Sequence, residues 1–340
     1  MAIISMEKFR EGQQGKKRER GKGGSNWEEN IQKFLNHCVA KNLRESTIDY
    51  YEKNLKNYLL RDFLPSANIK NVEDFDISDV DQFVVFWKNK GLKTTTINIR
   101  LRALRAFFYF LKEYKFSKNE VKIKMIKEDV KKIQTFTEKE VKKIIEKAKG
   151  EVTFACFRDW AMANFLIGTG VRMNTLRNIM VEDVNFSEST ITFRHTKNRE
   201  DQIFPMSLSL MQVLREYMDV REGEGDDILF CNVYGGQMGK KTINSRLKKY
   251  CREKLGGENG MRYSTHDFRH TFAVMYIRNS GGDILTLQKL LGHKSLEITR
   301  KYANMLFGDV QRQFGRFSPL DNLAAAKKSG RKAIKMSKER

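Results

Sequence analysis

The sequence predicts a mainly α-helical protein with a small β-sheet, divided into two domains. Only 3 of the 340 residues are proline, so long stretches lack the residue that most often interrupts helices. Apolar residues recur at helical intervals along most of the chain, and one short stretch has the pattern of a β-hairpin. A chain of this length can form two hydrophobic cores.

The first domain is expected over residues 25–116 as four helices. Ser25 and Glu28 have the spacing of a capping box, in which each side chain bonds a free backbone N–H at the start of a helix. Further helices are predicted over residues 47–60, from residue 78 onward and over residues 94–112. The last of them repeats apolar residues at the helical period, namely Ile97, Leu101, Leu104, Phe108 and Leu111.

The second domain is expected over residues 135–318 as a mixture of helices and strands, after a lysine-rich linker over residues 117–134. Residues 153–167 are apolar on nearly all sides, which predicts a helix buried at the centre of the domain. Two strand-like stretches frame the turn LysAsnArgGlu and predict a β-hairpin. Residues 1–24 and 319–340 are basic, and we expect a flexible arm and a tail there, as solvated segments or as phosphate contacts.

The charge balance points to a polyanionic partner. The chain carries 64 Lys and Arg against 42 Asp and Glu, a formal net charge of +22, which fits nucleic acid or an anionic membrane surface. No stretch approaches the roughly 18 uninterrupted apolar residues of a spanning helix, which excludes a membrane span. The N-terminus lacks the pattern of a secretory signal, and the cysteines are too scattered for a disulfide framework or a zinc site. We therefore expect a cytoplasmic protein without a metal or other cofactor.

Several polar residues of the second domain follow one another in a suggestive order. They are Arg172 in GlyThrGlyValArg, Lys197 on the hairpin turn, His266 and Arg269 in HisAspPheArg, His293 in LeuGlyHisLys, and Tyr302 in ThrArgLysTyrAla. No single element is specific, since a lone HxxR pattern recurs by chance. The ordered set resembles the tyrosine recombinase family over residues 135–315. More weakly, residues 46–51 and 94–108 resemble the core-binding helices of that family.

The resemblance implies a helical, SAM-like core-binding domain followed by a mixed α+β catalytic domain whose nucleophile is Tyr302. Two arginines, Arg172 and Arg269, would neutralise a phosphodiester that gains negative charge as it becomes five-coordinate. A tyrosine has a pKa near 10 and needs help to lose its proton, so His266 is the candidate base or hydrogen-bonding assistant. His293 would donate a hydrogen bond to a non-bridging oxygen, and Lys197 would protonate the leaving 5′-oxygen.

Other residues near this set receive a different interpretation. We assign His270 and His195 to structure. The family usually has an acidic residue three positions after the first arginine, where this chain has Thr175, and Glu182 and Asp183 lie in a stretch that resembles a later acidic position of the family. The missing carboxylate changes the expected tuning of the site but removes no group that touches the phosphate.

A basic face on the helix over residues 94–112 is the candidate DNA-contact surface of the first domain. Its residues are Lys93, Thr95, Asn98, Arg100, Arg102 and Arg105. Ordinary solvated helix faces are also rich in Lys and Arg, so each of these residues has a structural alternative.

The resemblance implies site-specific recombination of double-stranded DNA, through a 3′-phosphotyrosine at Tyr302, as in integration or transposition of a mobile element. A homotetramer would join two sites, assembled from a free monomer or dimer and held by residues 307–326, and accessory DNA-bending proteins are a further option. Two alternatives stay open. One is relaxation of supercoiled DNA, as by a type IB topoisomerase, and the other is a regulator that binds DNA without cutting it.

Overall fold

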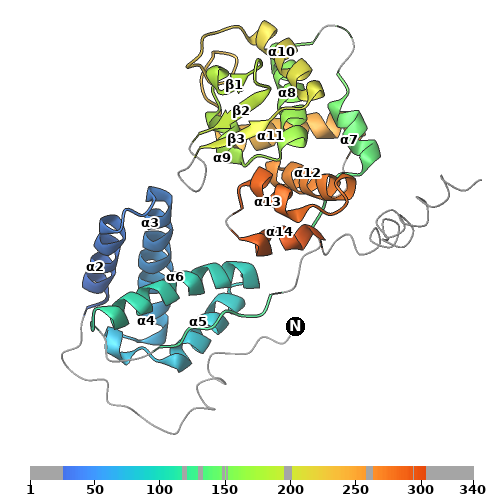
Figure 1. Ribbon diagram of the computed structural model, residues 1–340. Coiled ribbons are helices and arrows are strands. Elements are labelled where there is room, and N and C mark those ends of the chain that lie inside the picture. Colours follow the sequence, from blue (N-terminus) through green and yellow to red (C-terminus); the bar gives the residue numbers. More distant parts are fainter. Residues whose placement is uncertain are drawn as a thin grey trace, which may run out of the picture. The chain divides into compact units, whose positions relative to one another are not determined.

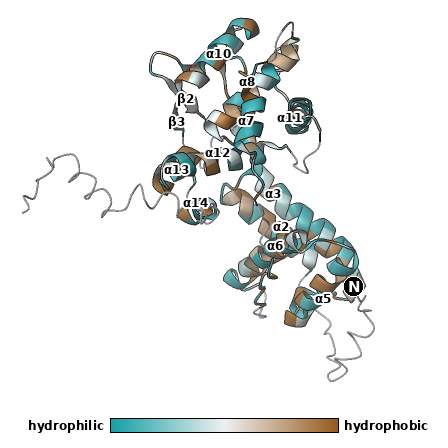
Figure 2. Ribbon diagram, turned by 90° about the vertical axis from the view of Figure 1, so that its right-hand side faces the viewer, coloured by the Kyte–Doolittle hydropathy of each residue, from teal (hydrophilic) through white to brown (hydrophobic). Residues whose placement is uncertain are grey.

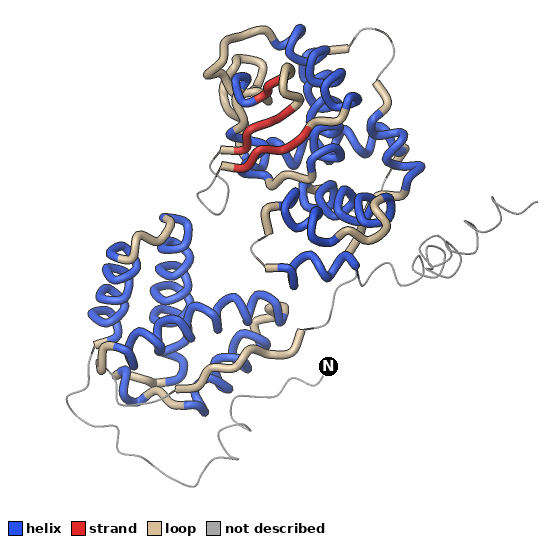
Figure 3. The backbone as a smooth tube through the Cα atoms, viewed as in Figure 1, coloured by secondary structure: helices blue, strands red, loops and turns tan. Residues whose placement is uncertain are grey.

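The computed structural model describes residues 26–116, 121–128, 133–147, 150, 152–194, 201–257, 263–293 and 295–303. The chain forms two compact units, residues 1–131 and residues 132–340. The described residues are mostly helical, and their strands form one small sheet in the second unit (Figure 1 and Figure 3). The predicted fold class is confirmed. Among the described helices, none combines the length and the apolar character that a bilayer crossing requires.

The first unit packs its helices around an aromatic core. In chain order they are α2 (Trp27–Ala40), α3 (Glu45–Glu52), the π-helical segment η1 (Lys53–Phe63), α4 (Leu64–Ala67), the 3₁₀ helix η2 (Val72–Asp74), α5 (Ile77–Asn89) and α6 (Thr94–Glu113). The Trp27 ring centroid lies 5.8 Å from that of Phe75 and 6.2 Å from that of Phe107. These buried rings hold α2 against α6 and against the segment before α5.

Two helices of this unit, α2 and α5, are capped within two residues of the predicted cap. Asn26 caps α2, because its side chain accepts a hydrogen bond from the backbone N–H of Glu28 at 2.8 Å. Asp76 caps α5 and forms a capping box with Asp79, two residues before the predicted start at Ser78. Asn, Asp and Ser supply the same acceptor chemistry, so a sequence rich in them fixes a helix start only to within a few residues.

Part of the predicted linker packs against the first unit. Ile123 is buried in the core of that unit. The side chain of Asn98 on α6 donates to the Ile126 carbonyl at 2.8 Å and accepts from the Ile126 N–H at 2.9 Å. The predicted linker over residues 117–134 therefore includes a segment, residues 121–128, that is fastened along α6.

The second unit surrounds one central helix with the other elements. They are α7 (Glu138–Ile145), α8 (Phe154–Thr169), α9 (Met173–Asn178), the 3₁₀ helix η3 (Val181–Asp183), β1 (Val184–Asn185), β2 (Thr190–Phe193), β3 (Gln202–Pro205), α10 (Leu208–Arg221), α11 (Lys240–Leu255), α12 (Thr265–Asn279), α13 (Ile284–Leu291) and α14 (Leu296–Ala303). Helix α8 contacts α7, α10, α11 and α12, and its Phe165 and Leu166 are fully buried. This is the central helix that the apolar run predicts.

The sheet and the outer helices cover this centre. Strands β2 and β3 pair antiparallel from Thr190 with Pro205 to Phe193 with Gln202, which is the predicted hairpin. Helix α11 is mostly hydrophilic (Figure 2), yet it buries Ile243, Leu247 and Cys251. An amphipathic outer helix of this kind shields the core while presenting a charged face to solvent.

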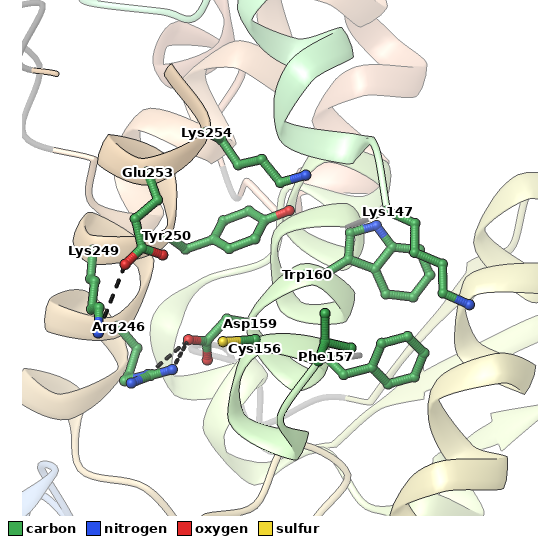
Figure 4. Close-up of a pocket in the computed structure, with 11 residues that line it drawn as sticks. Lys147, Cys156, Phe157, Asp159, Trp160, Arg246, Lys249, Tyr250, Glu253 and Lys254 are labelled. Carbon is green, nitrogen blue, oxygen red and sulfur yellow. Dashed lines mark hydrogen bonds and ion pairs between the residues drawn. The ribbon is translucent and has the colours of Figure 1, made fainter. Parts of the chain in front are cut away.

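A buried ion-pair network joins α8 to α11. The Asp159 carboxylate lies 2.9 Å from Nη2 of Arg158 and 2.6 Å from Nη2 of Arg246. Arg158 also donates from Nη1 to the Cys231 carbonyl at 3.0 Å. Beside this network lies a pocket of about 250 Å³ whose walls include Phe157 and Trp160 (Figure 4). Its lining residues come from α8, α11 and the chain between α7 and α8, so it is separate from the candidate catalytic residues.

Replacing Asp159 by Ala is expected to lower the free energy of unfolding by about 3–5 kcal/mol, because it leaves the buried Arg158 without its carboxylate. Urea unfolding followed by circular dichroism measures the change. The control is Glu216→Ala, which breaks the more exposed pair with Lys147 and should cost less than about 1 kcal/mol. Equal effects of the two variants would contradict the prediction.

Candidate active site

The GlyThrGlyValArg turn after α8 has a backbone that requires glycine. Gly170 ends the helix in the left-handed conformation, with φ at +60°, and a Cβ atom there would lie 2.5 Å from Cδ1 of Phe272. The Gly170 carbonyl accepts a hydrogen bond from Nη1 of Arg269 at 2.8 Å. The turn thus sets the start of α9, where Arg172 stands, and at the same time orients Arg269.

Arg269 is buried and held by main-chain carbonyls. Its side chain on α12 is part of a residue only 5% exposed, and Nη2 donates to the Leu291 carbonyl at 2.8 Å. Burial, followed by repulsion from Arg172, lowers the pKa of Arg269 to about 10. The guanidinium therefore stays charged at neutral pH, and among the described residues it donates hydrogen bonds to the Gly170 and Leu291 carbonyls and contacts the His293 ring.

Arg172 reaches the same helix end through longer contacts. Its Nη1 lies 3.3 Å from the Leu291 carbonyl oxygen, and its Nη2 lies 3.4 Å from that of Gly292. Burial lowers the pKa of Arg172, which is half-buried. Since hydrogen bonds this long are weak, the Arg172 guanidinium can exchange them readily for a charged acceptor.

His293 stands directly after α13 and contacts Arg269. Gly292 ends that helix with φ at +58°, and the next residue brings His293 Nε2 to 2.8 Å from Nη2 of Arg269. The other ring nitrogen, Nδ1, lies 2.9 Å from Oγ1 of Thr299 on α14. Burial and the two arginines lower the pKa of His293 to about 4, so the ring is neutral at pH 7. Because an arginine can only donate, Nε2 accepts here and Nδ1–H donates to Thr299.

Tyr302 on α14 is buried beside His270. The residue is 4% exposed, and its hydroxyl oxygen lies 2.9 Å from Nδ1 of His270. Burial raises the pKa of Tyr302, and the charges of Arg269 and Arg172 act in the opposite direction. The phenol is therefore protonated at neutral pH and lies within the electrostatic reach of both guanidinium groups.

The structure thus brings together four of the six predicted catalytic residues, namely Arg172, Arg269, His293 and Tyr302. His266 stands on the same helix as Arg269 but is exposed, and its ring centroid lies 6.4 Å from that of His270. The sequence interpretation missed the contact of His270 with the tyrosine. His270 lies four residues after His266, a spacing that places both on one side of a helix, and this signal could have found it.

The predicted acid Lys197 and the neighbouring His195 lie outside the described residues. The root of the hairpin that carries them is described, and it is fastened to α13. Nε2 of Gln202 on β3 lies 2.8 Å from the Lys289 carbonyl oxygen and 2.9 Å from that of Leu290. The first residues of β3 therefore lie at the C-terminal end of α13, where Arg172 and Arg269 also bind main-chain carbonyls.

The acidic residues near the first arginine serve the local fold. Asp183 is buried, accepts from the Met180 N–H at 2.9 Å and pairs with Arg194 at 2.6 Å. Glu182 pairs with the same arginine at 3.0 Å. Thr175 is partly buried on α9, and its carbonyl accepts the helix-ending N–H of Ile179. These contacts fix the chain between α9 and the sheet.

The expected DNA-contact face of α6 divides into accessible and buried residues. Lys93 and Arg102 are exposed, and Thr95 and Arg105 are partly exposed. These four residues remain candidates for phosphate contact.

Asn98 and Arg100 are 1% and 8% exposed, so the expectation that they lie on an exposed face is wrong. Asn98 holds the segment of residues 121–128, as described above. The Arg100 guanidinium stacks between two rings, 3.7 Å from the centroid of Tyr58 and 3.5 Å from that of Trp87. Such stacking stabilises a guanidinium inside a protein, and both side chains serve the packing of the first unit.

Replacing Arg102 by Ala is expected to weaken DNA binding and to reduce the slope of log K against log salt concentration by about 0.9, because one phosphate contact is lost. Fluorescence anisotropy over a salt series measures both quantities. The control is Lys56→Ala, a cation of the same unit outside the α6 face, which should leave the slope unchanged. An unchanged slope for Arg102→Ala would remove that residue from the interface.

The described residues contain no cluster of three or more His, Cys, Asp or Glu side chains that could hold a metal ion. The groups that are assembled around Tyr302 are cationic and neutral donors and acceptors. Such a set suits an anionic substrate, because buried positive charge is stabilised by the arrival of a negative group.

The comparisons with known proteins match both units. Residues 134–308 match the phage integrase family, and residues 31–115 match the N-terminal SAM-like domain of phage integrases. The tyrosine recombinase XerA of Pyrococcus furiosus is 27% identical over 295 residues, which cover 86% of this chain and 95% of that protein. The tyrosine recombinase XerC of Bacillus subtilis is 27% identical over 291 residues, with coverage of 82% and 93%.

Two solved structures share the fold. The Tn1549 transposon integrase in complex with transposon right end DNA has a TM-score of 0.67 at 19% identity, and the match covers 85% of this chain and 99% of that chain. The XerH site-specific recombinase in a post-cleavage complex with its difH substrate has a TM-score of 0.63 at 20% identity, with coverage of 86% and 85%.

Proposed function

Because the chain belongs to the phage integrase family of tyrosine recombinases, we propose that it recombines DNA at specific sites through a 3′-phosphotyrosine link at Tyr302. One observation carries the proposal. The buried hydroxyl of Tyr302 lies beside an imidazole and within the electrostatic reach of two guanidinium groups, which come from α12 and from the turn after α8.

The two arginines suit the charge that develops on the phosphate. During attack by the tyrosine, the phosphorus becomes five-coordinate and its equatorial oxygens gain negative charge. Arg172 and Arg269 now donate to neutral carbonyls of Gly170, Leu291 and Gly292. Exchange of some of these bonds for charge-assisted bonds to a phosphate would be favourable, and more so in the transition state than before it.

We propose that His293 orients Arg269, whereas the sequence predicts that it donates a hydrogen bond to a phosphate oxygen. It accepts from Arg269 and donates to Thr299, so its contacts orient the Arg269 guanidinium. A donor role toward a phosphate oxygen would require a proton on Nε2, which the negative charge of a phosphate favours. Lys197 remains the proposed acid for the leaving 5′-oxygen. The bond energy is kept in the phosphotyrosine link, so the exchange needs no nucleotide cofactor.

The remaining proposals concern partners and setting. The net charge of +22 would attract double-stranded DNA at a rate that falls with salt. We propose a homotetramer on two DNA sites, formed from a monomer or dimer, with accessory DNA-bending proteins as further partners. The biological outcome would be movement of a mobile element. The relatives and the solved structures are recombinases and integrases, which supports this setting. The segment 307–326, expected to hold the tetramer, lies outside the described residues.

A covalent trapping assay tests the function. The wild-type protein is incubated, without metal, with nicked DNA that carries the recombination site of its own element, and the products are separated before and after protease treatment. We expect a protease-sensitive protein–DNA adduct whose DNA-linked peptide contains Tyr302, as identified by mass spectrometry. Binding without an adduct would favour a non-catalytic regulator. Relaxation of supercoiled DNA that lacks the paired sites would favour the topoisomerase alternative.

A further inference from the structure

We infer that the pocket between α8 and α11 binds a small planar anion of the aromatic carboxylate class. The pocket has a volume of about 250 Å³ and is lined by residues of these two helices and of the chain between α7 and α8. This volume lies just below the range of about 300–1,000 Å³ that is usual for ligand pockets, so it suits a molecule of about one or two rings. The inference concerns a site apart from the DNA chemistry and does not depend on the proposed function.

The walls of the pocket are aromatic rings whose polar atoms already have partners. Phe157 and Trp160 of α8 are stacked, with their ring centroids 5.0 Å apart. The Nε1–H of Trp160 donates to the Ile145 carbonyl at 2.9 Å, and the Tyr250 hydroxyl donates to the Ile144 carbonyl at 2.6 Å. The walls therefore present apolar ring surface to a ligand, and a flat aromatic molecule makes favourable stacked or edge-to-face contacts with such rings.

The lining of the pocket carries an excess of positive charge. Asp159 is already bound by Arg158 at 2.9 Å and by Arg246 at 2.6 Å. Glu253 lies 3.8 Å from Lys249. The lining contains four Lys and Arg side chains and two carboxylates, and both carboxylates have partners. The difference of two positive charges favours an anionic ligand.

Two lysines lie beside the aromatic walls (Figure 4). Lys147 Nζ lies 5.0 Å from the ring centroid of Phe157, and Lys254 Nζ lies 5.9 Å from that of Tyr250. Lys147 also pairs with Glu216 at 2.6 Å. Lys254 donates to a neutral main-chain carbonyl at 2.6 Å, and within the described part of the chain no carboxylate pairs with it. A carboxylate on a ligand between the rings would form a charge-assisted hydrogen bond with Lys254, and this bond would orient the ligand.

Cys156 gives the pocket a chemical reporter. It is exposed and lines the pocket, whereas Cys38, Cys231 and Cys251 are buried. Iodoacetamide should therefore alkylate Cys156 first in the folded protein. A ligand in the pocket should slow that reaction, because it covers the thiol.

The test uses 2-naphthoate as the probe and 2-naphthalenemethanol, which has the same rings without the charge, as its neutral counterpart. Mass spectrometry measures the rate of alkylation at Cys156 over a concentration series of each compound, and calorimetry measures binding directly. We expect naphthoate to protect Cys156 with a dissociation constant of about 1 mM or lower, the range expected for a ligand of this size. The neutral alcohol should bind about threefold to tenfold more weakly, because it lacks the charge-assisted bond.

A lysine variant tests the recognition of the charge. Lys254→Met keeps the length of the side chain and removes the ammonium group. We expect it to weaken naphthoate binding about threefold to tenfold and to leave binding of the alcohol unchanged. The matched control is Lys142→Met, at an exposed position of α7 outside the pocket lining, which should change neither affinity.

Variants that fill the pocket test where the ligand binds. Cys156→Trp places a large ring at the mouth of the pocket and should abolish naphthoate binding in calorimetry, whereas Cys156→Ser should retain it. Val152 also lines the pocket and is 38% exposed, so Val152→Trp is a second filling variant. Melting temperatures are measured in parallel, and only variants that melt as the wild type does are compared.

The inference is overturned if naphthoate and the alcohol bind equally, or if Lys254→Met behaves as Lys142→Met does, since the pocket would then not select an anion. Equal binding of naphthoate to the filled variants and to Cys156→Ser would place the ligand elsewhere. Without any probe, alkylation of Cys156 as slow as that of the buried cysteines would mean that another segment or a second copy of the chain covers the pocket. None of these outcomes bears on strand cleavage, so the inference and the proposed function fail separately.

Discussion

Changing Tyr302 to Phe is expected to abolish the covalent DNA adduct completely, while folding and DNA binding persist. The phenyl ring can keep its place in the buried cluster with Ala273 and Leu287, so only the hydroxyl is lost. That loss removes the proposed nucleophile. It also removes the hydrogen bond to His270, and the loss of this bond costs on the order of 1 kcal/mol of stability. Denaturing gels of the trapping reaction, with anisotropy for DNA binding, measure both outcomes.

The matched control for this change is Tyr276→Phe. Tyr276 on α12 packs against the same cluster, so its variant removes a hydroxyl from a similar environment. We expect it to form adduct at the wild-type level. An adduct formed by Tyr302→Phe would assign the nucleophile to another side chain.

The order of the polar motifs correctly indicates that Arg172, Arg269, His293 and Tyr302 lie together in the second unit, because each motif carries its own local geometry. GlyThrGlyValArg predicts a turn that only glycine allows, and the HxxR spacing places His266 and Arg269 on one side of a helix. The sequence does not indicate what holds Arg269. Its partners are carbonyls of Gly170, 99 residues away, and Leu291, 22 residues away, and every residue has a carbonyl.

The first unit illustrates the opposite case. Helical periodicity correctly predicts which residues of α6 face its own core, such as Ile97 and Leu101. It cannot predict that other segments cover the polar side. Asn98 is covered by residues 121–128, and Arg100 by the rings of Tyr58 and Trp87. The sequence of a helix distinguishes an apolar face from a polar face. Whether a polar side chain is buried depends also on the other segments that pack against the helix.

Changing Arg269 to Lys is expected to lower the rate of strand cleavage on the order of 10²–10³-fold, although the positive charge remains. The guanidinium of Arg269 contacts the Gly170 carbonyl, the Leu291 carbonyl and the His293 ring at the same time. A lysine ammonium is a compact charge with three donors on a flexible side chain. It cannot make all three contacts and also form two parallel hydrogen bonds to a phosphate. Arg278→Lys, at an exposed position of the same helix, is the control and should cleave at the wild-type rate.

A substrate with a methylphosphonate at the scissile position separates the two reasons for this loss. The methyl group replaces one non-bridging oxygen and removes the negative charge that an arginine would neutralise. If Arg269 acts on that charge, Arg269→Lys and wild type should differ much less on the methylphosphonate than on the ordinary phosphate. An undiminished difference would mean that the guanidinium acts by holding the turn after α8 and the end of α13 in place, so that Arg172 and His293 are misplaced when it is lost.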